Sequence, residues 1–166
     1  DVVGYEEKDP RVTTRMRTGY PRFFLHPLIE QVRRELRPKA GRDVLPFGGR
    51  AAAEECARLA GGTAVEVDGI HAAFFPQDAL PVARGCWQHA GRGLSSRAAA
   101  EWLAHRSVSG TDETLATTIR KRLAPWSGAD PSMVTLHPSG MAAIHAAFRA
   151  VTARRPGCIT VMFGFP

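Results

Sequence analysis

The chain has 166 residues, 44% of them hydrophobic and 23% charged, which suits one packed domain or part of a larger one and excludes a wholly disordered protein. Its net charge is +6, and arginine supplies nearly all of the positive side chains, which are scattered among acidic residues rather than grouped in a nucleic-acid-binding block. Three cysteines stand far apart without C-x-x-C spacing, which excludes a disulfide framework and a zinc motif. The separated cysteines fit a reducing cytoplasm, and no apolar run is long enough to cross a membrane. We therefore expect a cytoplasmic protein without nucleic-acid or membrane partners.

Residues 1–26 contain prolines and aromatic side chains but no hydrophobic period, which predicts an extended arm with short helical turns. We expect this arm to pack on another subunit or domain, because it cannot bury Phe23 and Phe24 alone. A helix is expected from Pro27, since proline suits the first helical turn. Apolar residues then follow at helical spacing, at Leu28, Ile29, Val32 and Leu36.

The middle of the chain predicts a helix followed by a hairpin. The helix covers about Arg50 to Ala60 and ends at a glycine pair. Two short strands follow at residues 63–67 and 71–75. The Asp68-Gly69 pair between them favours a tight hairpin turn.

Three further helices are predicted between residues 78 and 126. Residues 78–93 form a short helix and then a glycine loop, and residues 95–106 form a helix with serine caps. Residues 111–126 form the third helix, whose apolar side chains share one face. These side chains are Leu115, Ile119, Leu123 and Trp126.

The last 34 residues predict a strand, a loop, a helix and a second strand, which is an α/β signal. The strands fall at residues 133–136 and 158–163, and the helix falls at residues 141–155. A compact domain rarely stops just as a central strand emerges. We therefore expect the chain to be a fragment or one subunit of a split protein.

The Ser139-Gly140-Met141 turn at the start of this last helix is the first candidate site. A helix N-terminus has unpaired amides and a partial positive charge, and glycine lets a phosphate approach the backbone closely. Ser139 caps the helix or gives its hydroxyl to the anion. An ordinary serine cap without a ligand is the alternative interpretation.

The segment from Trp87 to Arg97 is the second candidate site. Ser95, Ser96 and Arg97 stand at a predicted helix start, where they could hold a phosphate. The alternative is a glycine loop with a serine cap and a solvated arginine. The six histidines show no helical ligand spacing and no metal signature, so no metal site is predicted.

Together these segments resemble the cystathionine γ-synthase family of pyridoxal-phosphate enzymes, which belongs to the Cys/Met-metabolism group. "SGMAAI" at residues 139–144 is similar to the family's cofactor loop. "GYPRFFLHPLI" at residues 19–29 and "WQHAGRGLSSR" at residues 87–97 are similar to its γ-synthase-like branch. The resemblance implies an α/β fold class, with an N-terminal arm and a small α+β segment over residues 1–90. Residues 91–166 would begin the aspartate-aminotransferase-like (fold type I) domain that binds pyridoxal phosphate.

The resemblance also assigns the cofactor-binding residues. The family's phosphate turn falls on Ser139, Gly140 and Met141, whose backbone amides would bind the phosphate. The family's Tyr-x-Arg motif, which reaches the phosphate from a neighbouring subunit, falls on Ser95 and Arg97, with serine in place of tyrosine. The family's ring-stacking Tyr-Gly pair falls on Phe163-Gly164, where phenylalanine can stack but has no hydroxyl.

In this family the Schiff-base lysine and the acid that faces the ring nitrogen lie downstream of the Tyr-Gly position. None of Lys8, Lys39 and Lys121 matches the lysine motif, and Lys121 is read as solvated. The catalytic residues are therefore unknown, with the lysine expected outside this chain. The resemblance implies that a homo-oligomer or a second chain completes the active site.

The activity implied by the resemblance is γ-substitution of an activated homoserine by a thiol, in trans-sulfuration and methionine biosynthesis. A γ- or β-lyase, or an enzyme that makes an unusual amino acid, is the alternative within the family. A non-catalytic or split subunit that partners an active chain is the alternative outside it. Serine at residue 95 and phenylalanine at residue 163, in place of tyrosines, motivate that last alternative.

Overall fold

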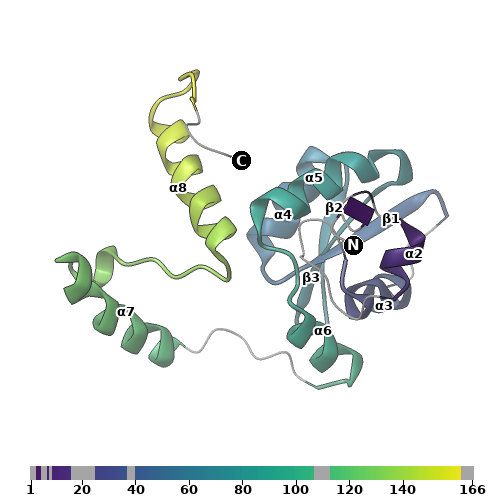
Figure 1. Cartoon of the computed structure of the whole chain (residues 1–166), viewed down its shortest axis with the longest axis horizontal. Helices are drawn as coiled ribbons and strands as arrows, with labels where there is room; N and C mark the ends of the chain where they lie inside the picture. Colours follow the sequence, from purple (N-terminus) through teal and green to yellow (C-terminus); the bar gives the residue numbers. More distant parts are fainter. Residues whose placement is uncertain are drawn as a thin grey trace.

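The computed structural model of the chain describes residues 3, 4, 7, 9–15, 25–36, 40–106 and 113–161. Its helices and strands are α2 (Pro10–Thr13), α3 (Pro27–Glu35), β1 (Arg42–Phe47), α4 (Arg50–Leu59), β2 (Thr63–Val67), β3 (Ile70–Pro76), η1 (Gln77–Ala79), α5 (Leu80–Ala90), α6 (Ser96–Leu103), α7 (Glu113–Ser127), η2 (Pro131–Met133) and α8 (Gly140–Arg154). All three strands lie between α3 and α5 in the chain, and helices make up the rest of its regular structure in the described residues (Figure 1).

The three strands form one antiparallel sheet in the order β1-β3-β2. The hairpin predicted around Asp68-Gly69 is confirmed as β2 and β3, with Val67 paired to Ile70 at the turn. β1 pairs antiparallel with the other side of β3. β1 and β2 therefore run in the same direction, are joined by α4, and have β3 between them, which is a split β-α-β arrangement.

Strand β1 was not predicted from the sequence, because Pro46 and the Arg-Asp pair at its start weaken a strand pattern. The structure tolerates Pro46 because β1 is an edge strand. The Pro46 carbonyl points away from β3 and accepts the Leu94 amide at 3.1 Å. Phe47 forms an isolated bridge with Gly93. Residues 93 and 94 therefore pair briefly with the outer edge of β1.

The sheet is covered on both faces, with α4 and α5 on one side and α3 and α6 on the other (Figure 1). Alternate residues of β1 face opposite layers, as a strand requires. Leu45 and Phe47 pack into the α4 and α5 layer, whose core also contains Phe75. Ile29 and Val32 of α3 pack with residues of α6 in the second layer. The described fold is therefore a small α+β domain, as expected, and its second layer includes α6. The predicted domain boundary at residue 90 stays a prediction.

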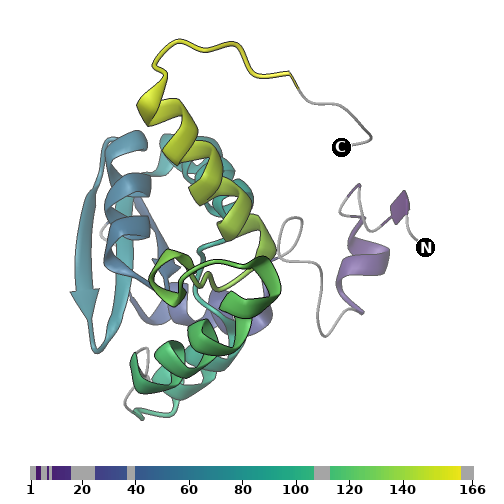
Figure 2. The same cartoon turned by 90° about the vertical axis from the view of Figure 1, so that its left-hand side faces the viewer.

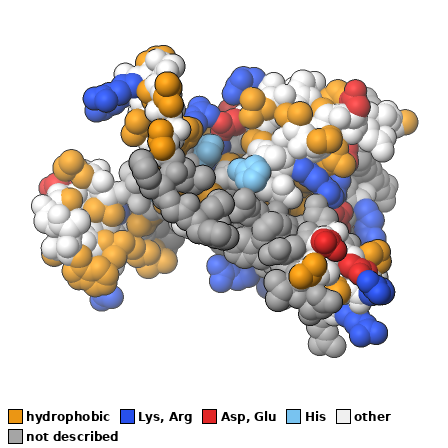
Figure 3. Space-filling model, turned by 45° about the horizontal axis from the view of Figure 1, so that its top comes forward, with side chains coloured by type: hydrophobic (Ala, Val, Ile, Leu, Met, Phe, Trp, Pro, Cys, Tyr) orange, Lys and Arg blue, Asp and Glu red, His pale blue; other side chains and the backbone are white. Residues whose placement is uncertain are grey.

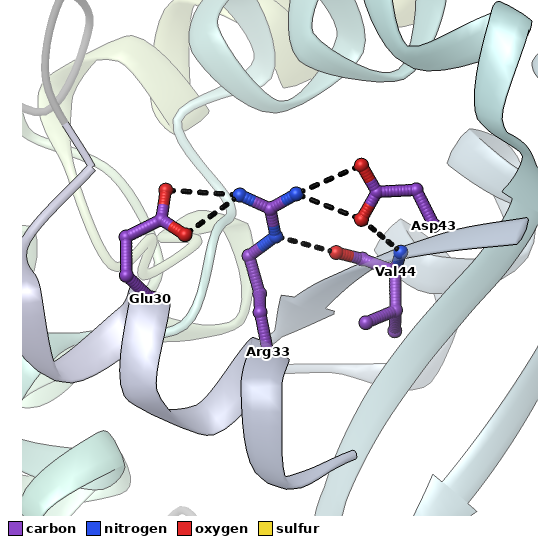
Figure 4. Close-up of polar contacts among 4 residues, drawn as sticks. All are labelled: Glu30, Arg33, Asp43 and Val44. Atoms are coloured by element: carbon purple, nitrogen blue, oxygen red, sulfur yellow. Dashed lines mark hydrogen bonds and ion pairs between the residues drawn. The ribbon is translucent and has the colours of Figure 1, made fainter. Parts of the chain in front are cut away.

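The side chain of Arg33 fastens α3 to β1 (Figure 4). This side chain is only 12% exposed, and its guanidinium lies between the carboxylates of Glu30 and Asp43. Arg33 Nε donates to the Val44 carbonyl at 2.8 Å, and Arg33 Nη2 donates to Asp43 Oδ1 at 2.7 Å. The planar fork of arginine thus bonds two carboxylates and one backbone carbonyl at once.

Helices α7 and α8 lie beside the sheet and its covering helices (Figures 1 and 2). α8 packs on α5, and α7 packs on η2. The predicted apolar face of α7 is largely uncovered, since Leu115 is 58% exposed and Trp126 is 85% exposed. Figure 3 shows hydrophobic side chains gathered on this outlying part of the molecule.

The predicted strands on either side of α8 are wrong for the described residues. Residues 133–136 end η2 and continue without regular structure, and residues 158–161 are exposed and irregular. A strand needs a neighbouring strand to pair its backbone groups, and none lies beside these segments in the described part of the chain. Within residues 113–161 the α/β unit predicted around α8 is therefore not formed, and the described fold is α+β.

None of the helices in the described ranges combines the length and the apolar character that crossing a bilayer requires.

Candidate site for a cofactor phosphate

Ser139 is the N-cap of α8, as one of the two sequence interpretations predicted. Its hydroxyl oxygen accepts the Ala142 amide at 3.1 Å, which satisfies one of the amides that a helix leaves unpaired at its start. The same hydroxyl donates its proton to the Gly91 carbonyl at 2.9 Å. In this arrangement the Ser139 hydroxyl proton is engaged by the protein, so the backbone amides are left as the donors for an anion.

Gly91 brings the two candidate segments of the sequence together. It follows α5 in the left-handed conformation, with φ of 63°, which favours glycine. A β-carbon there would lie 2.6 Å from Ser139 Oγ and 2.8 Å from the Ala142 amide nitrogen. The glycine loop after α5 therefore supports the first turn of α8 by direct contact.

The amides of Gly140 and Met141 are the open donors of this site. Neither amide makes a hydrogen bond among the residues that the structure describes. A β-carbon added at Gly140 would meet no atom within 4 Å, and Gly140 is exposed. Two unpaired amides at the positive end of a 15-residue helix, beside an exposed glycine without close neighbours, fit a phosphate group.

Ser95 is the N-cap of α6, where its hydroxyl accepts the Ala98 amide at 3.1 Å. Arg97 is exposed. Within the described ranges, no hydrogen bond or ion pair joins Ser95 or Arg97 to the Ser139 turn. The contribution of these two residues to a phosphate site stays a prediction, as does that of Phe163-Gly164, which lies outside the described residues.

Glu55 of α4 makes a contact that the sequence did not predict. Glu54-Glu55, like other adjacent acidic pairs, would be expected to lie in solvent, because neighbouring helix residues point in different directions, but the side chain of Glu55 is only 14% exposed. Glu55 accepts hydrogen bonds from Arg92, which follows Gly91, and from Arg149 of α8. Figure 3 shows acidic, basic and histidine side chains side by side where α8 meets the rest of the molecule.

Glu54 and Glu55 are adjacent but differ in how far their side chains are exposed. Adjacent residues on a helix point in different directions. Glu54 is 52% exposed and pairs with Arg50 one turn earlier on the outer face. The apolar run of α4, at Ala52, Ala53, Cys56 and Ala57, places Glu55 at the edge of the buried face, and this was the available sequence signal.

His145 lies on α8 close to this ion cluster. Burial is the main cause that lowers its pKa from the usual 6.5, and the positive charge of Arg92 lowers it further. Glu55 acts in the opposite direction and raises the pKa, while Arg149 lowers it. Because the pKa of His145 is lowered from 6.5, its imidazole is mainly neutral at pH 7 and adds no charge to the Glu55 cluster.

Lys121 is exposed on α7, in agreement with its reading as a solvated residue. Lys8 and Lys39 lie outside the described residues. The described ranges hold no group of three His, Cys, Asp or Glu side chains that could bind a metal ion.

Comparison with known proteins shows that the chain is related to cystathionine γ-synthase-like proteins. This relationship confirms the resemblance inferred from its motifs. It is 36% identical over 167 residues to L-2-amino-4-chloropent-4-enoate dechlorinase/desaturase of Streptantibioticus cattleyicolor, covering 91% of this chain and 33% of that protein.

Two fungal relatives cover a smaller part. Cystathionine gamma-synthase of Neurospora crassa is 31% identical over 58% of this chain and 21% of its own length. Cystathionine gamma-synthase-like enzyme iboG1 of Amanita muscaria is 30% identical over 52% of this chain and 20% of its own length. The chain thus spans one third or less of the length of these relatives. No protein-family model and no solved structure matches it.

Proposed function

We propose that the chain forms the N-terminal, phosphate-binding part of a pyridoxal-phosphate-dependent enzyme of the cystathionine γ-synthase type. The carrying observation is the pair of open amides at Gly140 and Met141, which Ser139 and Gly91 hold against α5. The relatives supply the class of enzyme. Under this proposal, residues beyond the α+β segment begin a fold type I domain.

The described residues fit the phosphate of this cofactor. The Gly140 and Met141 amides would donate to its oxygens, and the α8 dipole would favour its negative charge. Arg97 of a neighbouring subunit would add a positive charge, and Phe163 would stack on the ring. When bound, the cofactor supplies a ring that withdraws electrons from the bonds at the substrate's α-carbon. Ser139 and Gly91 act by keeping the two amides aimed outward.

The reaction we propose is γ-substitution, in which a thiol replaces the leaving group of an activated homoserine. The second candidate is elimination without addition of a thiol. It is favoured by the relative that covers most of this chain, whose name places a chlorine on carbon 4, the γ-carbon of its amino acid. Both candidates need a lysine for the cofactor aldehyde, which a further part of the protein or a second chain would provide.

The substitution Gly140→Val tests the phosphate site. Valine at residue 140 projects into open space in the described structure, so we expect the fold to be retained. It also crowds the two open amides, so we expect the affinity for pyridoxal phosphate to fall about tenfold, which corresponds to the loss of one charge-assisted hydrogen bond. The measurement is the Kd from equilibrium dialysis of the complete protein.

Gly85→Val is the matched control, because Gly85 of α5 also faces open space. It should leave the Kd unchanged. Equal affinities of the two variants for pyridoxal phosphate would mean that the α8 N-terminus is an ordinary serine cap and not a phosphate site. A complete protein that binds no pyridoxal phosphate in any form would contradict the enzyme proposal and favour a non-catalytic partner.

A further inference from the structure

Glu55 joins three separate elements through one carboxylate. It lies on α4 and bonds Arg92 in the loop between α5 and α6 through Oε2, and Arg149 of α8 through Oε1. Both carboxylate oxygens are therefore engaged, each by a different guanidinium. The side chains of Glu55 and Arg92 are 14% and 25% exposed, so water and salt screen that pair less than they screen pairs on an open surface, whereas Arg149 is 56% exposed and its pair is screened more.

The two arginines connect Glu55 to the two elements that meet at the phosphate turn, the loop after α5 and α8. Arg92 directly follows Gly91, whose carbonyl accepts the Ser139 hydroxyl. Arg149 stands nine residues after Gly140 on α8, which corresponds to about 13 Å along the helix axis. One contact near the start of α8 and one well along it fix both the position and the direction of the helix.

We infer that Glu55 is a positioning residue for the phosphate-binding turn. By holding Arg92 and Arg149 together, it sets the first turn of α8 on the loop after α5, and thereby aims the Gly140 and Met141 amides at the ligand. This inference rests on the proposed function. It assigns Glu55 no contact with the cofactor.

The negative charge of Glu55 allows a positioning role to be distinguished from a purely electrostatic effect, because the two predict opposite changes in phosphate affinity. Removing a negative charge near an anion site strengthens anion binding if the electric field alone matters. If Glu55 acts by positioning, removing it weakens phosphate binding in spite of that field. Glu55→Gln therefore separates the two effects, because it keeps the size of the side chain and removes its charge.

The test compares pyridoxal phosphate with pyridoxal, which lacks the phosphate, on the complete protein. In Glu55→Gln we expect the Kd of pyridoxal phosphate to rise about tenfold, for the loss of a charge-assisted contact, while the Kd of pyridoxal stays the same. General loss of structure would weaken both ligands alike. Glu54→Gln is the matched control, since it makes the same change one residue earlier on the exposed face, and it should alter neither Kd.

Hydrogen exchange supplies a second measurement that needs no cofactor. The amides of Ala142 and Ala143 bond to Ser139, so their exchange reports on the turn itself. We expect faster exchange there in Glu55→Gln than in Glu54→Gln. Unchanged exchange, or a Kd of pyridoxal phosphate that falls or stays constant, would overturn the inference. If the unmodified protein binds both ligands equally, the proposed phosphate site fails, while the exchange result still decides the role of Glu55.

Discussion

At the scale of single residues, the glycines of the loop after α5 are required for two different reasons. Gly91 has a positive φ, and it also leaves no room for a β-carbon beside Ser139 and Ala142. Gly93 has only the second constraint, because a β-carbon there would lie 2.2 Å from Nε1 of the Trp87 indole. The sequence indicates a glycine loop, but it does not distinguish conformational need from close packing.

Gly91→Ala and Gly128→Ala together separate these two causes. Gly128 also has a positive φ, of 65°, but a β-carbon there meets nothing within 4 Å. We expect Gly128→Ala to lower the free energy of unfolding by about 1 kcal/mol for the left-handed backbone alone. Gly91→Ala should cost about 3 kcal/mol, because the added methyl group must also displace the α8 turn.

Urea denaturation of both variants measures this difference. The same loss of stability in the two proteins would mean that α8 moves away from residue 91 without cost. In that case the contact between Gly91 and Ser139 could not position the phosphate turn.

At the scale of secondary-structure elements, the helices and the hairpin follow from local signals. Proline at the start of α3, serine at the start of α6 and Asp68-Gly69 between β2 and β3 mark their boundaries in the sequence. β1 carries no such signal, since it is stabilised by pairing with β3 and not by its own propensity. The strands predicted around α8 fail for the same reason, because an apolar run becomes a strand only beside a partner.

The candidate site shows the same division between local and distant signals. Ser139, Gly140 and Met141 could be recognised because a serine, a glycine and a helical run are adjacent in the sequence. Glu55 and Arg149 are 94 residues apart, so only the fold brings them together. A lone sequence contains no information on that pairing beyond the amphipathic pattern of each helix.

The packing of α3 on β1 depends on the forked shape of Arg33, and this can be tested by Arg33→Lys. Lysine keeps the charge but cannot bond Glu30, Asp43 and the Val44 carbonyl together. We expect a loss of about 2 kcal/mol in the free energy of unfolding, because the side chain of Asp43 is only 18% exposed and would lose its guanidinium partner, keeping only the Val44 amide.

Arg34→Lys provides the comparison, since Arg34 is the next residue on α3 and is exposed. Its effect should stay within about 0.5 kcal/mol. Thermal or urea unfolding monitored by circular dichroism measures both variants. Two indistinguishable curves would show that charge alone, and not the fork geometry, holds α3 on the sheet.

At the scale of the whole molecule, an apolar face runs along α8 on the side away from α5. Ile144, Phe148 and Val151 follow one another at helical spacing and are 66%, 47% and 57% exposed. Exposed apolar residues that share one helix face are typical of an interface. Under the proposed function we expect a second copy of the chain to cover it.

Ile144→Glu tests whether this face associates. We expect the 166-residue chain to self-associate through α8, and a buried glutamate in place of isoleucine should weaken the association about tenfold or more. Val82→Glu places the same charge on α5, at a residue that is 51% exposed, and should have no effect. Sedimentation equilibrium measures both, and equal association constants would exclude the α8 face as the contact.

The order of strands in the sheet has a consequence for synthesis on the ribosome. The strand that lies in the middle, β3, is the last of the three to be made. Until residue 76 has left the exit tunnel, β1 has no strand to pair with, and Val44, Leu45 and Phe47 have no complete core to enter. A pause in translation between β1 and β3 would therefore hold an apolar, unpaired strand in water, which is the form most open to chaperone binding and aggregation.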